Sequence, residues 1–244
     1  MNDNAVILTK AERVRVATNL RPKDAATVLI IDRSSRTPRV LMGKRHASHK
    51  FMPGKFVFPG GRVDPGDRRM ACTGALSQVC EDRLMKRAVR PSSQKARALA
   101  LAAIRETFEE TGLLFGAADL GTPERPPAGT WTDFASHGIF PDLGAVTFVA
   151  RAITPPRRPK RFDTRFFTLD YSTLGGKIDG VVGPDSELVE LVWVDFKEAQ
   201  ELDLPTITQV ILREVEDRIT RGFAPYLPVP FYWEKNGSFV REEL

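Results

Sequence analysis

The chain has 244 residues, enough for one sizeable domain with additions or for two small ones, and we expect one domain over residues 1–244. A hydrophobic content of 42% and a charged content of 27% exclude a chain that is disordered throughout its length. No apolar run approaches the roughly 20 residues that cross a bilayer. The first ten residues also lack the pattern of a secretory signal. We therefore expect a cytoplasmic protein with no membrane partner.

The formal net charge of +5 is concentrated in one stretch of the chain. Residues 68–97 carry eight basic and two acidic side chains, a net charge of +6. No aromatic residues that could stack on bases are interleaved with these charges, so an anionic small molecule is a better partner than nucleic acid. The only cysteines, Cys72 and Cys80, supply neither a disulfide framework nor a complete zinc site.

Strand patterns come first along the chain. Residues 26–31 (ATVLII) and 39–42 (RVLM) predict the two strands of a hairpin. The segment FMPGKFVFPGGR at 51–62 predicts a brief strand at 56–58 that ends in Pro59 and two glycines. A glycine pair at such a place indicates positive φ or close approach of the backbone to another group.

Helical periodicity follows. Apolar residues recur at helical intervals from about 68 to 93, which predicts an inserted helical element before the PSSQ break. A stronger helix is predicted over 98–111, and Gly112 stands where helices favour a terminal glycine. The Pro- and Gly-rich residues 116–143 predict a loop.

Three further strands are predicted at 145–153, 161–169 and 188–194, and they should extend the sheet. Residues 206–221 predict an amphipathic helix whose apolar stripe should cover a face of that sheet. Residues 223–244 form an aromatic, Pro-rich C-terminal extension for which the sequence predicts no element. Hairpins combined with crossovers indicate an α/β layered domain around a mixed sheet.

Three carboxylates gather on the helix predicted at 98–111. At about 100° per residue, Glu106, Glu109 and Glu110 lie at about 0°, 300° and 40°, on one face of the helix. Their mutual repulsion is relieved by a hard divalent cation, which takes oxygen ligands. The alternative is a solvated acidic helix face without a ligand.

Two segments resemble the halves of the Nudix box, which reads Gly, five residues, Glu, seven residues, then Arg-Glu-x-x-Glu-Glu-x-Gly. Residues 60–67 (GGRVDPGD) resemble the first half and residues 105–113 (RETFEETGL) the second. The resemblance implies a Nudix-like α/β/α sandwich around a mixed β-sheet, with a bound Mg²⁺ or Mn²⁺. It also implies catalytic and metal-binding roles for the glutamates, an extra metal ligand in a glycine carbonyl, and a structural ion pair; the residues concerned are Glu106, Glu109, Glu110, Gly60 and Arg105.

The match departs from the Nudix box at three places. Asp67 replaces the usual Glu, Thr107 replaces an apolar residue, and 37 residues separate Asp67 from Arg105 instead of seven. A branch of the family resembling the peroxisomal coenzyme A diphosphatases carries an insertion at this place, which corresponds here to a helical insertion at about 68–97. That branch also has sequences like FMPGKFVFPGGRVDPGD and RFDTRFF, both of which occur in this chain.

Further candidates lie outside the helix. Glu187, in a loop before a predicted strand, is the loop candidate for the general base, and an exposed turn carboxylate is the alternative. Arg161 and Arg165 alternate along one strand face, where they contact substrate phosphate or join a cross-strand ion network. Arg45, at the end of the second strand, and Gly61 complete the substrate-binding candidates.

These residues predict metal-dependent hydrolysis of a diphosphate bond in a nucleoside diphosphate linked to another group, with coenzyme A or an acyl-coenzyme A as the first candidate. A non-catalytic Nudix-like nucleotide sensor is one alternative, although a sensor needs no such carboxylate cluster. A basic nucleic-acid-binding domain is the other, favoured by charge alone. The substrate is then a small-molecule diphosphate, and a homodimer is left open.

Overall fold

A mixed β-sheet forms the centre of the computed structural model, which describes residues 3–11, 15–16, 18–49 and 52–244. Phe51, the first residue of the FMPGK segment, lies outside these described residues. The main strands follow one another across the sheet in the order β10 (Leu188–Asp195), β2 (Arg39–Arg45), β1 (Lys23–Asp32), β8 (Phe162–Asp170), β7 (Thr147–Ile153), β11 (Pro230–Lys235) and β12 (Ser238–Glu243).

The central strand β1 changes partner along its length. Its last residues pair with β2, where Ile31 lies opposite Val40, and its first residues pair with the short strand β4 (Gly60–Arg62). Another short strand, β3 (Phe56–Val57), pairs with the far end of β2. The sheet therefore divides on this side of β1, and the glycine pair of β4 lies at the division.

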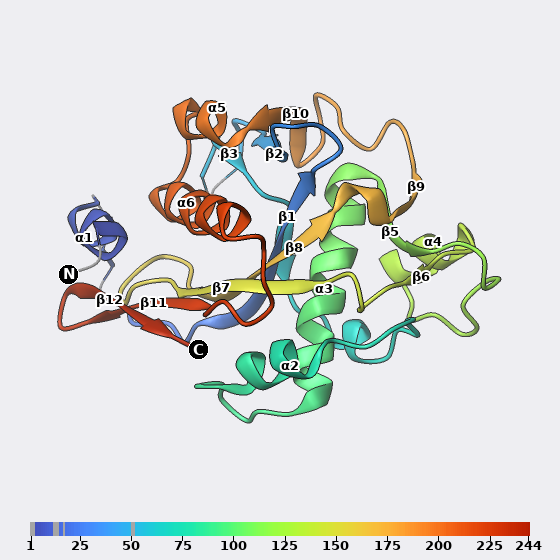
Figure 1. Cartoon of the computed structure of the whole chain (residues 1–244), viewed down its shortest axis with the longest axis horizontal. Helices are drawn as coiled ribbons and strands as arrows, with labels where there is room; N and C mark the ends of the chain where they lie inside the picture. Colours follow the sequence, from blue (N-terminus) through green and yellow to red (C-terminus); the bar gives the residue numbers. More distant parts are fainter. Residues whose placement is uncertain (1–2, 12–14, 17, 50–51) are drawn as a thin grey trace.

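Helices cover both faces of this sheet, as the sequence predicts (Figure 1). The long helix α3 (Ser93–Thr111) packs its alanines and leucines on one face, together with α2 (Gln78–Met85). On the other face lies α6 (Thr206–Thr220), which shares a core with α1 (Asp3–Lys10) and α5 (Phe196–Glu201). The result is an α/β/α sandwich.

Smaller elements surround α3. A second sheet contains β5 (Leu113–Ala117), β6 (Phe140–Pro141) and β9 (Leu174–Lys177), and α4 (Thr130–Ser136) precedes β6. Single 3₁₀ turns occur at Pro65–Arg68 and Tyr171–Thr173. The residues 116–143, which the sequence predicted as a loop, thus contain a helix and a short strand. None of the helices among the described residues is long and apolar enough to span a membrane.

Two other segments differ from the sequence prediction. The helix predicted at 98–111 begins earlier, at Ser93, because the Ser92 side chain accepts a hydrogen bond from the Lys95 backbone N–H and caps it. The C-terminal residues form the hairpin of β11 and β12, which joins the sheet beside β7. The alternation of apolar and polar residues that predicts a strand is hard to recognise there, because prolines interrupt it and because the tyrosine and tryptophan of β11 are buried to different extents.

Several of the basic residues at 68–97 bind other parts of the fold. Arg97 donates to the backbone carbonyl of Arg68 at 3.1 Å, and Arg83 donates to two carbonyls of the chain at 225 and 226, each at 2.9 Å. Arg87 forms an ion pair with Glu242 at 2.6 Å. These arginines bind backbone and side-chain oxygens of the fold, which accounts for part of the charge excess without nucleic acid.

A carboxylate on α6 joins both ends of the chain. Glu214 accepts hydrogen bonds from Asn4 of α1 at 3.1 Å, from Tyr232 of β11 and from Arg241 of β12 at 3.1 Å. Burial alone would raise the pKa of Glu214, but the bonds from Arg241 and Tyr232 and the positive charge of Arg241 hold it below its usual value. The charged form of Glu214 therefore stabilises the fold.

We predict that Glu214→Gln lowers the free energy of unfolding at pH 7 by about 1–3 kcal/mol, because a charge-assisted hydrogen bond is lost and Arg241 is left without it. A carboxyl with a depressed folded-state pKa contributes stability above its unfolded pKa and loses it as pH falls through the folded value. The difference between variant and wild type should consequently shrink in acid. Urea unfolding at pH 7 and pH 3 measures it, with Glu216→Gln on the exposed side of the same helix as the control. An equal difference at both pH values would contradict this role.

Candidate active site

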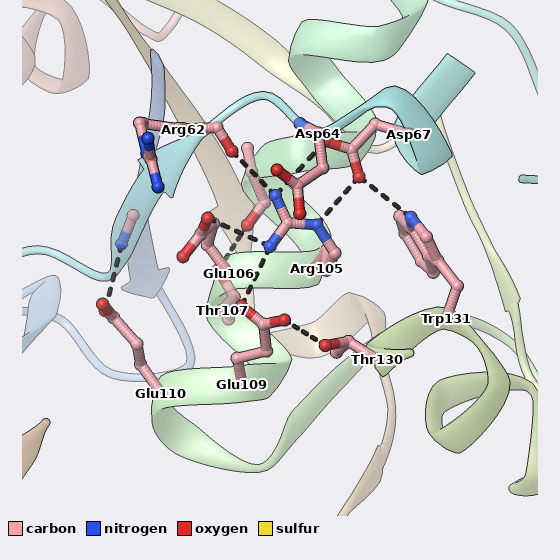
Figure 2. A network of polar contacts seen from close by, with 12 residues as sticks. Arg62, Asp64, Asp67, Arg105, Glu106, Thr107, Glu109, Glu110, Thr130 and Trp131 are labelled. Atoms are coloured by element: carbon pink, nitrogen blue, oxygen red, sulfur yellow. Dashed lines mark hydrogen bonds and ion pairs between the residues drawn. The ribbon is translucent and has the colours of Figure 1, made fainter. Parts of the chain in front are cut away.

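The site is organised by a buried ion pair between α3 and the turn after β4 (Figure 2). Arg105 donates from Nε to Asp67 Oδ1 at 2.8 Å and from Nη2 to the backbone carbonyl of Arg62 at 2.8 Å. Its Nη1 reaches Glu106 at 3.0 Å and Glu109 at 2.9 Å. Burial alone would lower the pKa of Arg105, but the bond to Asp67 and the three carboxylate charges raise it.

Asp67 is completely buried and accepts hydrogen bonds from several sides. Besides Arg105, its donors are the backbone N–H of Asp64 at 2.7 Å and the indole N–H of Trp131 at 2.9 Å. Trp131 belongs to α4, and its neighbour Thr130 donates to Glu109. Sequence reasoning missed both residues, because the segment around α4 has no apolar periodicity and resembles no part of the motif.

The two glycines of β4 meet two glutamates of α3. The backbone N–H of Gly60 donates to Glu110 Oε2 at 3.1 Å. A Cβ atom placed on Gly61 would lie 2.4 Å from the carboxyl carbon of Glu106, so no other residue fits there without displacing that carboxylate. The sequence predicted close backbone approach at this pair, and the two halves of the motif do meet here.

Glu106 and Glu110 are held in an environment that disfavours their charge. Burial raises the pKa of Glu106 to about 7, and the charge of Glu109 adds to this against the opposing effect of Arg105. Burial also raises the pKa of Glu110 well above its ordinary value, with further contributions from the charges of Glu187 and Glu106. Two buried carboxylates that lie close together destabilise the protein when no cation is present. A bound cation would offset this cost.

Glu187 reaches this place from the loop before β10. Its carboxylate forms an ion pair with Arg45 at 2.8 Å, and its backbone carbonyl accepts from the His46 N–H at 3.0 Å. Arg45 also contacts His49 Nδ1 at 3.2 Å, while its buried Nε has no hydrogen-bond partner within the described part of the chain. An arginine so placed can bind an anion.

A cleft of about 520 Å³ collects most of the residues that the sequence singled out. Those that line it are Arg45, Gly60, Gly61, Glu106, Glu110 and Glu187. Glu109 differs, since its carboxylate is bound by Arg105 and Thr130. Among the described residues, no three acidic, histidine or cysteine side chains already converge as a preformed metal site.

The structure corrects the expectation for two arginines. Arg165 is completely buried and pairs with Asp24 at 2.8 Å and with Asp163 at 3.1 Å. Its strand neighbours Thr164 and Phe166 line the cleft, so alternation directs Arg165 to the opposite face of the sheet.

Arg161 is likewise occupied, with bonds to the backbone carbonyls of Leu20 at 2.6 Å and Thr154 at 3.1 Å. Among the described residues, neither Arg161 nor Arg165 lines the cleft that holds the carboxylates. The ion network that the sequence left as the alternative is what the structure contains around Arg165.

Known proteins similar to this chain carry the Nudix name. A "Putative nudix hydrolase 7" of Caenorhabditis elegans is 28% identical over 188 residues, which cover 72% of this chain and 52% of that protein. The crystal structure of a NUDIX hydrolase from Alicyclobacillus acidocaldarius is 28% identical, with a TM-score of 0.58 over 79% of this chain and 90% of that one.

These similarities have a defined extent. The chain spans about half the length of the curated relative that it matches. No family model matches the chain. The fold is the Nudix fold, and the names of the relatives support the Nudix hydrolase family for this chain.

We predict that Asp67→Asn lowers the free energy of unfolding by about 3–5 kcal/mol, because it leaves the buried Arg105 charge without its buried partner. Glu109→Gln removes a partner whose side chain is 34% exposed, and should cost about 1 kcal/mol or less. Denaturant unfolding of both variants compares the two. Equal losses would show that Asp67 is no more important to the fold than a surface partner.

A second prediction concerns Glu106, whose pKa of about 7 lies above the ordinary value of 4.5. Between these values the folded protein holds a proton that the unfolded chain has lost, so stability falls as pH rises. Glu106→Gln should therefore raise the metal-free unfolding free energy at pH 8 by about 1–3 kcal/mol and change it little at pH 5. Thermal melting in a chelator at both pH values checks this. A variant that melts below wild type at pH 8 would mean that the pairing with Arg105 outweighs burial.

Proposed function

We propose that this protein is a divalent-metal-dependent hydrolase that cleaves a diphosphate bond in a nucleoside diphosphate linked to another group. The observation that carries the proposal is the meeting of Glu106, Glu110 and Glu187 with Arg45 in one cleft. Buried carboxylates with raised pKa values beside an arginine supply both a cation site and an anion site. The similarity to Nudix hydrolases supports the same reaction class.

The donor chemistry of the cleft fits Mg²⁺ or Mn²⁺. Both ions prefer carboxylate and carbonyl oxygens, and Glu106 and Glu110 are buried carboxylates that repel each other's charge. These two residues would hold the metal, with the Gly60 carbonyl and Glu109 as the further candidates from the sequence. A bound divalent cation neutralises charge on the phosphate oxygens and lowers the pKa of bound water.

The remaining residues of the cleft would perform the other parts of the reaction. Arg45 would bind a phosphate oxygen through its guanidinium, at the price of its present contact with Glu187. Glu187, released from that ion pair, would accept the proton of the attacking water as the oxygen bonds to phosphorus and the anhydride bond breaks. Gly61 would allow the substrate to approach the backbone beside Glu106.

Coenzyme A or an acyl-coenzyme A is the first candidate substrate, on the resemblance of residues 51–67 and 161–167 to that branch of the family. ADP-ribose and dinucleotides are the comparison compounds. A nucleotide sensor without catalysis is disfavoured, because it would not require carboxylates buried at an energetic cost. A cytoplasmic location and a homodimer stay predictions.

The test is incubation of the pure protein and Mg²⁺ or Mn²⁺ with coenzyme A, ADP-ribose, NADH and capped nucleotides, with products identified by mass. We expect two phosphorylated fragments from at least one compound. No product from any compound with either metal would overturn the hydrolase assignment.

We predict that Glu110→Gln lowers kcat by about 10²–10³, because a carboxylate that stabilises transition-state charge through the metal is lost. The metal-free protein should melt no lower than wild type, since the buried carboxyl already carries a raised pKa. The rise in melting temperature on adding Mg²⁺ should shrink. Glu190→Gln, a half-exposed residue that pairs with Lys44 on the sheet edge, is the matched control. Full turnover by Glu110→Gln would make Glu110 a structural residue.

A further inference from the structure

One nitrogen of Arg45 carries two contacts. Its Nη2 forms the ion pair with Glu187 Oε1 at 2.8 Å and also lies 3.2 Å from Nδ1 of His49. The Arg45 side chain is 13% exposed. Because a guanidinium donates hydrogen bonds and never accepts them, the second contact requires a neutral His49 whose Nδ1 is the acceptor. His49 is therefore an uncharged partner of Arg45, whereas Glu187 is a charged one.

The turn after β2 is held by bonds that do not need the His49 ring. The backbone N–H of His46 donates to the Glu187 carbonyl at 3.0 Å, and the Ser48 N–H donates to His46 Nδ1 at 3.0 Å. The backbone N–H of His49 donates to the His46 carbonyl at 3.1 Å. The His49 ring adds an edge-on contact with the His46 ring, with centroids 6.4 Å apart. A change of the His49 side chain should consequently leave the backbone of the turn in place.

Substrate binding would separate the two partners of Arg45. A phosphate oxygen that replaces the Glu187 carboxylate can leave the His49 contact intact, because a neutral imidazole does not repel an anion. Nε, which has no partner within the described part of the chain, and the released Nη2 hydrogen can then both donate to the phosphate. An arginine without such an anchor has to be ordered at each binding event, which weakens binding by about three- to tenfold.

We propose that His49 is a positioning residue that orients Arg45 toward a phosphate group of the substrate. The inference rests on the proposed function and adds to it a residue that acts through Arg45. A neutral acceptor fixes the guanidinium without neutralising its charge. A carboxylate at position 49 would instead compete with the phosphate, as Glu187 does before the substrate binds.

Three variants of His49 separate its shape, its acceptor atom and its lack of charge. His49→Asn keeps a neutral acceptor close to the position of Nδ1, His49→Leu removes the acceptor, and His49→Asp has the shape of Asn with a negative charge. Isothermal titration with inorganic pyrophosphate and Mg²⁺ compares them. We expect a Kd near that of wild type for Asn and a Kd raised about three- to tenfold for Leu. For Asp, the Kd should exceed that of Asn by about tenfold or more.

Two results of the titration would overturn the proposal. One is an Asn variant that binds pyrophosphate as weakly as the Leu variant, because the acceptor atom would then have no role. The other is a wild-type protein that binds no pyrophosphate in the presence of Mg²⁺. Melting temperatures of the three variants show whether each one is folded.

Turnover and a double variant test whether the effect passes through Arg45. With the best substrate, His49→Leu should raise KM by the same factor as the Kd and change kcat by less than about twofold. In an Arg45→Gln background, His49→Leu should have no further effect. His137→Leu, at an exposed histidine that follows α4, is the matched control and should change neither constant. An effect of His49→Leu that persists without Arg45 would contradict a positioning role.

The two proposals fail in different ways. If no diphosphate is hydrolysed with either metal, the proposed function is wrong, and the pyrophosphate titrations still decide the role of His49. If hydrolysis occurs but the three His49 variants bind pyrophosphate equally, His49 is not a positioning residue and the hydrolase assignment stands.

Discussion

The buried ion pair between Asp67 and Arg105 is the interaction on which the rest of the site depends. Removing two charges from water is costly, and the cost is offset only when further hydrogen bonds satisfy both groups. Here they come from the Arg62 carbonyl, the Asp64 N–H and the Trp131 indole. The pair thereby fixes α3 against the turn after β4. Because the pair fixes the rotation of α3 about its own axis, Glu106 and Glu110 face Gly61 and Gly60 of β4.

The motif glutamates are separated by this geometry into two environments. Glu109 remains partly exposed between Arg105 and Thr130, where its charge is satisfied. Glu106 and Glu110 are pressed against Gly61 and Gly60, where burial raises their pKa values. A fold selected for stability alone would not retain two such carboxylates. Their cost is explained if a cation compensates it when the protein acts.

Much of the fold can be predicted from local sequence patterns. The face of the sheet to which a given side chain points cannot be predicted in this way. Periodicity in the sequence indicated the hairpin, the helix predicted over 206–221 and the helix that carries Glu106 and Glu110. Alternation also placed Arg161 and Arg165 on one face. Which face that is depends on the pairing of β8 with β1, and residues paired from distant segments leave no local signal. The same reason hid Trp131, whose partner Asp67 lies 64 positions away.

The length of the cleft depends on contacts that are still more distant in sequence. Its far wall forms because Thr9 of α1 binds the backbone of Phe239, 230 positions away, and because Glu214 ties the same two elements to α6. The glutamates and glycines of the cleft thus come from a short motif, whereas Leu8 and Phe239, which also line it, are brought together from the two ends of the described chain. A change at either end of the described chain can therefore alter the shape of the cleft while Glu106, Glu110 and Arg105 keep their places, because the two sets of contacts share no residue.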